Sequence, residues 1–222
     1  MNLLVLLLLG TLSAVVAAEP QNAVVVVPVA DVWSRPLMPG EKPSDELRET
    51  QVLFGEKVIV HESSGPWSLI EALEQPEFTH HNRWEGYPGW VSKDSLAPSQ
   101  GERAGVRGSL TITTQWAPIH LDRMHEKTTV FLPLGATINK RNSDNDWTRF
   151  DYPSMQPFAW IKNQYLGSRG ELLNKLVEPQ IRSDVLENSE ILSGTSYLWG
   201  GLTPGNPPPL THTLSPQGGR GD

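Results

Sequence analysis

The chain has 222 residues, of which 38% are hydrophobic and 19% charged, so it carries enough apolar side chains for packed cores and is not disordered throughout. Its formal net charge is −7 and no run of Lys and Arg offsets it, which excludes nucleic acid as the expected partner because phosphate binding needs a basic surface. It contains no Cys, so these residues hold no disulfide, no thiolate metal site, no cysteine nucleophile and no lipid-bearing cysteine. With 19 Gly and 19 Pro, the composition favours short strands and turns over long helices.

The first 18 residues predict an export signal. An apolar run over residues 3–9 is followed by small, uncharged residues that end in Val16, Ala17 and Ala18, which is the pattern of a hydrophobic segment with a cleavage site after Ala18. The alternative is an uncleaved anchor, but the apolar stretch is short for the roughly 20 residues of a spanning helix. We therefore expect an exported mature chain in the periplasm, the cell envelope or the extracellular space, with no membrane attachment after cleavage.

The central part of the sequence contains two copies of one pattern. Gly55 precedes Trp67 by 12 residues, and Gly135 precedes Trp147 by the same interval. In both copies an apolar strand leads to a polar turn, ESSGP or RNSDND, and then to a strand that opens with Trp. Such turns suit the reversal of a β-hairpin, so each copy is predicted to be a unit of antiparallel strands.

These copies predict a mainly β protein with two tandem domains. Residues 23–98 and residues 107–167 are each expected to form a small β-barrel, with a linker over residues 98–104. The first copy is longer because it carries two extra loops, at residues 37–50 and 73–86. Long loops on a small barrel are usually either functional or mobile.

The tryptophans divide by their position in the copies. Trp67 and Trp147 occupy equivalent positions and are predicted to pack inside the barrels. Trp33, Trp84 and Trp116 lie nearer to loops and are candidates for a ligand-binding face.

The pattern changes from residue 171 onward. Apolar residues Ile181, Val185 and Leu186 recur at helical spacing, and TSYLWGG follows them. Residues 178–203 are therefore interpreted as a short helix and the start of a further domain. Residues 204–222 are rich in Pro and Gly with almost nothing apolar to bury, which predicts a disordered tail.

This order of a signal peptide, two barrels, a short helix and YLWGG resembles that of the NlpC-type cell-wall peptidases, the γ-D-glutamyl-L-diamino-acid endopeptidases. The motifs that carry the resemblance are VADVWSRP (29–36), ETQVLFGEKV (49–58), GYPGWV (86–91) and SYLWGG (196–201). The resemblance implies two bacterial SH3-like domains followed by a papain-like α+β peptidase domain. It also implies hydrolysis of the bond between D-glutamate and the diamino acid in peptidoglycan stem peptides.

The sequence departs from this family at the catalytic centre. In the family, the Trp-Gly-Gly turn is followed by Asp-Cys-Ser-Gly, whose Cys is the nucleophile and is activated by a His farther on. Here no Cys occurs and only His212 follows residue 203. No catalytic residue is therefore assigned, and no cleavage by this mechanism is expected. Residues 178–203 are interpreted as the start of a truncated peptidase domain, and the tail as the product of a frameshift or insertion.

The resemblance assigns substrate binding to Tyr87 and Glu49. In the family, the first SH3-like domain lines the substrate groove and selects stem peptides that begin with a free L-Ala amine. Tyr87 of GYPGWV matches the aromatic residue that faces the substrate, and Glu49 of ETQ matches the carboxylate that pairs with the amine. A carboxylate facing an ammonium group and an aromatic edge packing on a methyl group suit such a pocket. Glu56 is the alternative to Glu49, because the two lie close together in the same motif.

No metal site and no cofactor are expected. His61, His80 and His81 could be combined into a metal site, but adjacent His side chains on an extended segment point in opposite directions.

Three functions remain open at this point. The first is the substrate-recognising, non-catalytic part of an NlpC-type endopeptidase that binds stem peptides. The second is an envelope adaptor whose barrels bind another protein. The third is an active enzyme whose catalytic half is supplied by a separate chain or an unrecorded reading frame. Loss of peptide binding on Tyr87→Ala would favour the first function over the second.

Overall fold

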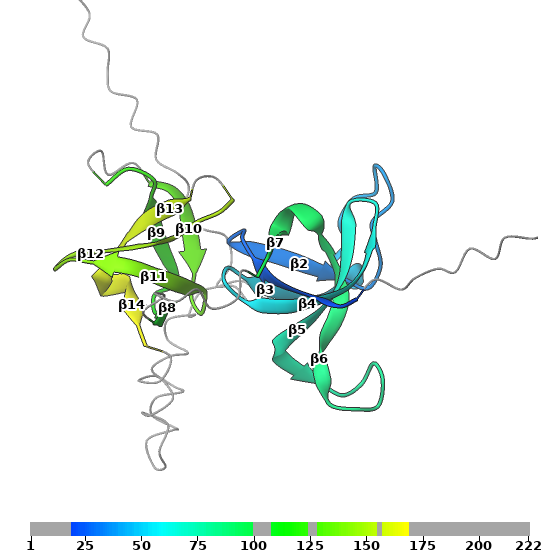
Figure 1. The fold of residues 1–222 in the computed structure, drawn as a ribbon. Helices are drawn as coiled ribbons and strands as arrows, with labels where there is room; N and C mark the ends of the chain where they lie inside the picture. The colour runs from blue at the N-terminus through cyan, green and yellow to red at the C-terminus, as the bar shows by residue number, and fades with distance from the viewer. Residues whose placement is uncertain (1–18, 100–107, 124–127, 155–156, 169–222) are drawn as a thin grey trace, which may run out of the picture.

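The computed structural model describes residues 19–99, 108–123, 128–154 and 157–168 (Figure 1). These residues form two antiparallel sheets of seven strands each, so the expectation of a mainly β protein is confirmed. No helix in this described part is long and apolar enough to cross a membrane. Three predicted segments lie outside the described residues: the export signal at 1–18, the helix and domain start at 178–203, and the tail at 204–222.

The first sheet is built from the first copy of the repeat. Its strands are β1 (Gln21–Val25), β2 (Val29–Trp33), β3 (Arg48–Leu53), β4 (Lys57–Ser64), β5 (Trp67–Glu77), β6 (Glu85–Ser92) and β7 (Leu96–Pro98). They are ordered β3-β2-β6-β5-β4-β1-β7. Two short 3-10 helices, η1 (Asp45–Leu47) and η2 (Lys93–Ser95), precede β3 and β7. The longest hairpin is β5–β6, whose register shifts between Ala72 and Pro76 and which extends to the pair Glu77 and Glu85.

The second sheet repeats this topology. Its strands are β8 (Ser109–Ile112), β9 (Trp116–His120), β10 (Thr128–Pro133), β11 (Thr137–Ser143), β12 (Trp147–Asp151), β13 (Phe158–Lys162) and β14 (Leu166–Gly167), with η3 (Asn163–Tyr165) before β14. The order β10-β9-β13-β12-β11-β8-β14 is that of the first sheet shifted by seven. Gly55 and Gly135 occupy the equivalent turns before β4 and β11, with φ of 82° and 88°, a left-handed conformation that glycine adopts without strain. The repeat seen in the sequence is therefore one strand order used twice.

Strand pairing leaves both sheets open. In the part of the chain that the structure describes, the end strands β3 and β7 do not pair with each other, and neither do β10 and β14. The strands curve strongly in Figure 1, but their hydrogen bonds do not close a ring. The interpretation of each unit as a closed barrel thus stays a prediction.

Each unit has its own apolar core, because alternate residues of the strands point to one face. In the first unit the buried core includes Val25, Val32, Val52, Val58, Ile70 and Val91. In the second unit it includes Ile112, Ile119, Leu132, Ile138, Phe150 and Ile161. Trp147 is buried as predicted, at 6% exposure, whereas its counterpart Trp67 is only half-buried.

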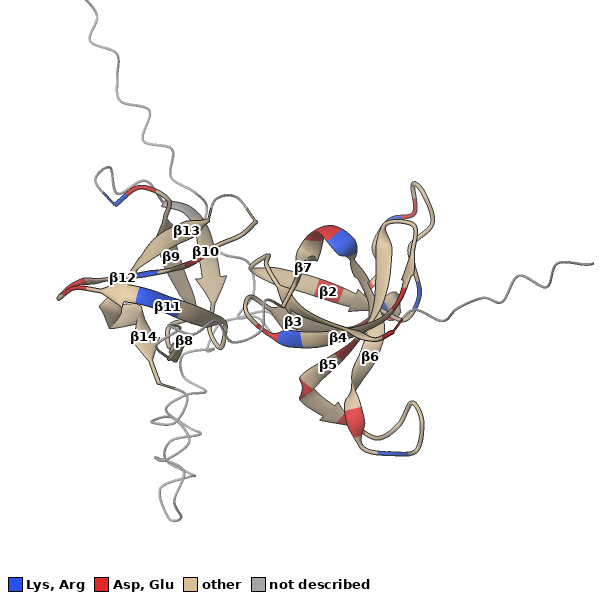
Figure 2. Cartoon of the chain, in the orientation of Figure 1, with Lys and Arg blue, Asp and Glu red and all other residues tan. Residues whose placement is uncertain are grey.

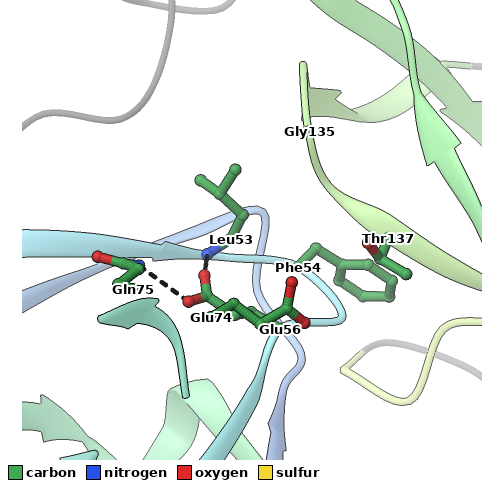
Figure 3. Close-up of a pocket in the computed structure, with 7 residues that line it drawn as sticks. All are labelled: Leu53, Phe54, Glu56, Glu74, Gln75, Gly135 and Thr137. Atoms are coloured by element: carbon green, nitrogen blue, oxygen red, sulfur yellow. Dashed lines mark hydrogen bonds between the residues drawn. The ribbon is translucent and has the colours of Figure 1, made fainter. Parts of the chain in front are cut away.

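One side chain of the first unit belongs to the core of the second. Phe54, in the turn between β3 and β4, is 4% exposed and stacks on Tyr152 with ring centroids 5.5 Å apart. It also meets Phe150 edge-to-face at 6.1 Å. The amide of Thr137 donates a hydrogen bond of 2.9 Å to the carbonyl of Phe54. Figure 3 shows the Phe54 ring reaching from its turn toward Thr137 of the second unit.

Candidate functional site

The two residues assigned to substrate binding from the sequence lie in direct contact. Glu49 is on β3 and Tyr87 on β6, and β2 lies between these strands in the sheet. The Tyr87 hydroxyl donates a hydrogen bond of 3.1 Å to Oε2 of Glu49, across the intervening strand. Both side chains are half-buried, so they can be reached by a ligand while being held by the protein.

Tyr87 is held as a neutral hydroxyl. Burial raises the pKa of Tyr87 to about 12, and the hydrogen bond to the Glu49 carboxylate acts in the same direction. Its ring packs against the core of the first unit. The hydroxyl therefore keeps its proton and donates a hydrogen bond to Glu49, and its lone pairs stay available to a donor from a ligand.

The alternative carboxylate, Glu56, lies in a different place. It is 8% exposed in the β3–β4 turn, where it accepts hydrogen bonds from the Leu53 amide at 3.0 Å and from Gln75 Nε2 at 2.8 Å. Figure 3 draws these two bonds in a cavity of about 140 Å³ between the two units. Glu56 therefore stabilises the turn that carries Phe54, and Glu49 is the carboxylate that touches Tyr87.

A third side chain joins the pair. The ring of His80 lies edge-to-face with that of Tyr87, with centroids 5.2 Å apart. Its Nε2 is 3.8 Å from Oε2 of Glu49, which is too long for a hydrogen bond. Its Nδ1 is 3.0 Å from Oε1 of Glu77. The sequence suggested His80 only as a candidate metal ligand, and the signal that could have found it is its position in the long loop at residues 73–86.

Glu77 fixes the loop that carries His80. Its carboxylate is buried at the end of β5 and accepts hydrogen bonds from the amide and hydroxyl of Thr79, at 2.7 and 2.9 Å, and from the amide of His80 at 3.3 Å. Burial acts to raise the pKa of Glu77, but the hydrogen bonds from His80 and Thr79 outweigh it and lower the pKa to about 2. Glu77 is therefore an anion at neutral pH that holds the hairpin tip in one conformation.

An exposed aromatic pair stands next to this loop. Phe78 and Trp84 flank it at the two strand ends, with ring centroids 5.7 Å apart and exposures of 44% and 75%. Trp84 is thus accessible, as a ligand-face candidate must be. The prediction for Trp33 is wrong, because this residue is 5% exposed in a central strand and its ring is covered by the Arg48 guanidinium at 5.4 Å.

Acidic side chains gather where β5 and β6 run toward the hairpin, and a basic residue stands at the tip (Figure 2). The carboxylates are those of Glu71, Glu74, Glu77 and Glu85, and the basic residue is Arg83. Arg83 is bound to Glu85 at 2.6 Å. The surroundings of Tyr87 therefore carry an excess of negative charge, which attracts a cationic group.

The three histidines considered for a metal each face a separate carboxylate: His61 faces Glu71, His80 faces Glu77 and His81 faces Glu85. In the described ranges, no group of three or more His, Asp or Glu side chains is arranged to hold a metal ion.

Comparison with known proteins gives two curated relatives, while no protein-family model matches the chain. A γ-D-glutamyl-L-lysine dipeptidyl-peptidase of Bacillus subtilis (strain 168) is 26% identical over 170 residues, which is 72% of this chain and 49% of that protein. A protein of the same name from Bacillus cereus (strain ATCC 10987 / NRS 248) is 25% identical over 157 residues, which is 70% of this chain and 45% of that protein. The chain thus spans about half the length of the curated relatives it matches.

A solved structure shares the fold. The crystal structure of an NlpC/P60 family protein from Bacillus cereus ATCC 10987 superposes with a TM-score of 0.65 at 19% identity. The match covers 82% of this chain and 67% of that chain. Together with the two relatives, it confirms the resemblance carried by the sequence motifs.

Proposed function

Because this chain is related to the NlpC/P60 cell-wall peptidases, we propose that it is the substrate-recognising part of a peptidoglycan peptidase. The half-buried pair of Glu49 and Tyr87 binds the free L-Ala amine of stem peptides, and the two sheets correspond to two SH3-like domains. The observation that carries the proposal is the 3.1 Å hydrogen bond between these two side chains. It brings a carboxylate from β3 and an aromatic ring from β6 to one half-buried position.

The chemistry of this pair of side chains fits a primary amine next to a small side chain. A carboxylate is the natural partner of an ammonium group, and charge-assisted hydrogen bonds of this kind are about twice as strong as neutral ones. The Tyr87 hydroxyl donates its hydrogen bond to Oε2 of Glu49, so Oε1 of Glu49 and the phenolic lone pairs remain for the ligand. The adjacent ring offers an apolar edge to the alanine methyl group.

The composition decides between substrate binding and substrate cleavage as the proposed role. None of the 222 residues is a cysteine, so the thiol mechanism of the family has no nucleophile among them. We therefore assign binding, and not cleavage, to these residues. The proposal includes export by the segment at 1–18, since peptidoglycan lies outside the cytoplasm.

A second candidate is an envelope adaptor that binds another protein. The observation that favours it is the exposed pair of Phe78 and Trp84, because neighbouring apolar side chains at a rigid hairpin suit a protein contact. Capture of an envelope protein that is lost in Trp84→Ser and kept in Glu49→Gln would support this candidate.

The test is a titration of the chain with the tripeptide L-Ala-γ-D-Glu-diamino acid, in which binding is measured by calorimetry and by Trp fluorescence. We expect saturable binding that weakens about 10-fold or more in Glu49→Gln, because a hydrogen bond to a charged partner is lost. Tyr87→Phe should weaken binding less, by roughly 3-fold to 10-fold, because it removes a neutral hydroxyl. Glu62→Gln, which removes an exposed carboxylate on β4, is the matched control and should bind like the wild type. Equal binding of the N-acetylated tripeptide, or no binding at millimolar concentration, would refute the proposal.

A further inference from the structure

The side chain of Gln75 connects the two strands of β5 and β3 beside the proposed site. We propose that Gln75 is a positioning residue, whose amide sets the separation of Glu49 and Tyr87. The inference rests on the proposed function of that pair. It concerns how the protein builds the site and leaves the choice of ligand to the pair itself.

The amide of Gln75 makes three hydrogen bonds to β3 and the turn that follows it. Its Oε1 accepts a hydrogen bond of 2.8 Å from the Thr50 hydroxyl. Its Nε2 donates to the Gln51 carbonyl and to Oε1 of Glu56, both at 2.8 Å. Both hydrogens of the amide nitrogen are therefore used. Figure 3 shows the bond from Gln75 to Glu56.

These bonds join two strands that are not neighbours in the sheet, because β2 and β6 lie between β3 and β5. The backbone ladder therefore does not hold β3 directly against β5, and the Gln75 side chain does. Its partners Thr50, Gln51 and Glu56 are all buried. A buried polar group that loses its partner destabilises the folded state, so each of these bonds keeps the two strands at a fixed distance.

Both ends of this contact lie next to the proposed site. On β3, Glu49 directly precedes the two residues that Gln75 binds. On β5, Ala72 is the cross-strand partner of Tyr87, and the register then shifts so that the next paired residue is Pro76. Gln75 lies in this bulge, and bulges often re-aim a side chain next to a site. The amide therefore fixes the strand of Glu49 relative to the segment that pairs with Tyr87.

The contact between Glu49 and Tyr87 depends on that distance. Their 3.1 Å hydrogen bond spans β2, so it requires β3 and β6 to stay at one separation. A shift of about 1 Å would take the two oxygens beyond hydrogen-bond distance. Without the Gln75 amide, part of the binding free energy would be lost in ordering the pair, and affinity should fall.

The first test measures tripeptide affinity in two variants at pH 7.5 and pH 5.0. Gln75→Ala should bind about 5-fold to 10-fold more weakly than the wild type at both pH values. Gln75→Glu has the same shape, but its carboxylate would face two acceptors, the Gln51 carbonyl and the Glu56 carboxylate. Only the protonated form can replace the amide, and the neighbouring negative charge favours that form.

The affinity of Gln75→Glu relative to the wild type should therefore depend on pH. We expect it to be about 10-fold lower at pH 7.5 and within about threefold at pH 5.0. Gln21→Glu makes the same change at an exposed position of β1 and should bind like the wild type at both pH values. A general loss of packing in Gln75→Glu would not be restored by a proton.

A second measurement needs no ligand. Burial raises the pKa of Tyr87 to about 12, and the hydrogen bond to Glu49 contributes to this shift. Loosening the pair removes that contribution. In an NMR titration of the tyrosine ¹³Cζ signals, Tyr87 should therefore ionise at a lower pH in Gln75→Ala than in the wild type. The control Gln21→Ala should leave the titration unchanged.

The outcomes separate this inference from the proposed function. Unchanged ionisation of Tyr87 in Gln75→Ala would overturn the positioning role. So would an affinity of Gln75→Glu that equals the wild type at both pH values, or one that stays equally low at both. Failure of the wild type to bind any tripeptide would instead refute the proposed function, and the titration of Tyr87 would still decide whether Gln75 holds the pair together.

Discussion

Replacement of Phe54 by alanine should weaken the second unit more than the first, although the residue belongs to the first unit in sequence. Its ring is 4% exposed among the core side chains of the second unit. It makes two ring contacts, a stacked one with Tyr152 at 5.5 Å and an edge-to-face one with Phe150 at 6.1 Å. Such contacts contribute about 0.5–1.5 kcal/mol each beyond the burial of the ring itself.

The magnitude follows from these contacts. Truncation of a buried Phe to Ala costs about 3–5 kcal/mol through lost burial and the cavity left behind. A cavity of about 140 Å³ already lies beside this turn, so water can reach part of the vacated space. We therefore expect a loss at the lower end, about 3 kcal/mol, in the free energy of unfolding of the second unit.

Urea denaturation combined with amide hydrogen exchange measures this effect. Exchange should accelerate in β11 and β12, and the two units should unfold in separate transitions once the shared side chain is gone. Phe78→Ala makes the same chemical change at a position that is 44% exposed and should cost less than about 1 kcal/mol. If Phe54→Ala costs no more than this control, or if exchange rises only in the first unit, the shared-core reasoning is refuted.

Two further predictions concern the same turn and the hairpin tip. Gly55→Ala should be more destabilising than Gly135→Ala, although both residues have φ near +85°. The added Cβ would lie 1.8 Å from the Thr137 carbonyl oxygen in the first case and no closer than 3.4 Å to any neighbour in the second. Equal losses of unfolding free energy in chemical denaturation would contradict the close approach of the two units. The lowered pKa of Glu77 means that the folded state favours its carboxylate, so this group adds stability above pH 4.5 that is lost as the pH falls from about 4.5 to about 2. Glu77→Gln should flatten this part of the pH profile and speed amide exchange at Thr79, and a profile identical to that of the wild type would show that the hairpin tip does not depend on the charge.

Most of the fold could be predicted from the sequence because it is encoded locally. The Gly-to-Trp spacing recurs in both copies, and each glycine marks the same turn before the fourth strand of its sheet. Alternating apolar residues then place one face of each strand in a core. The contact between the units was not predictable in this way, because the sequence does not distinguish Phe54 from any other apolar residue at the end of a strand. Nothing in its neighbours reveals that its core lies about 100 residues farther along the chain.

Only the residues of the candidate site that lie in recognisable motifs were predicted from the sequence. Tyr87 and Glu49 come from two motifs recognised by resemblance, and the structure places them in hydrogen-bond contact. His80 and Glu77 lie in the extra loop of the first copy, which has no counterpart in the second copy to align with. Their 3.0 Å contact is local, because the two residues are three apart, but the edge-to-face contact of His80 with Tyr87 is set by the hairpin fold, which no pattern of residue types predicts.

The two copies of the repeat share their strand order but differ at the positions of Glu49 and Tyr87. Aligned on the shared glycines, Glu49 corresponds to Thr129, and aligned on the tryptophans of β6 and β13, Tyr87 corresponds to Pro157. The second copy thus retains the strand order but has neither the carboxylate nor the phenol. The core of the second copy includes Phe54, which lies in the turn directly after β3, the strand that carries Glu49. The first copy therefore carries both residues of the proposed site, and the second copy packs around the side chain that directly follows the strand of Glu49.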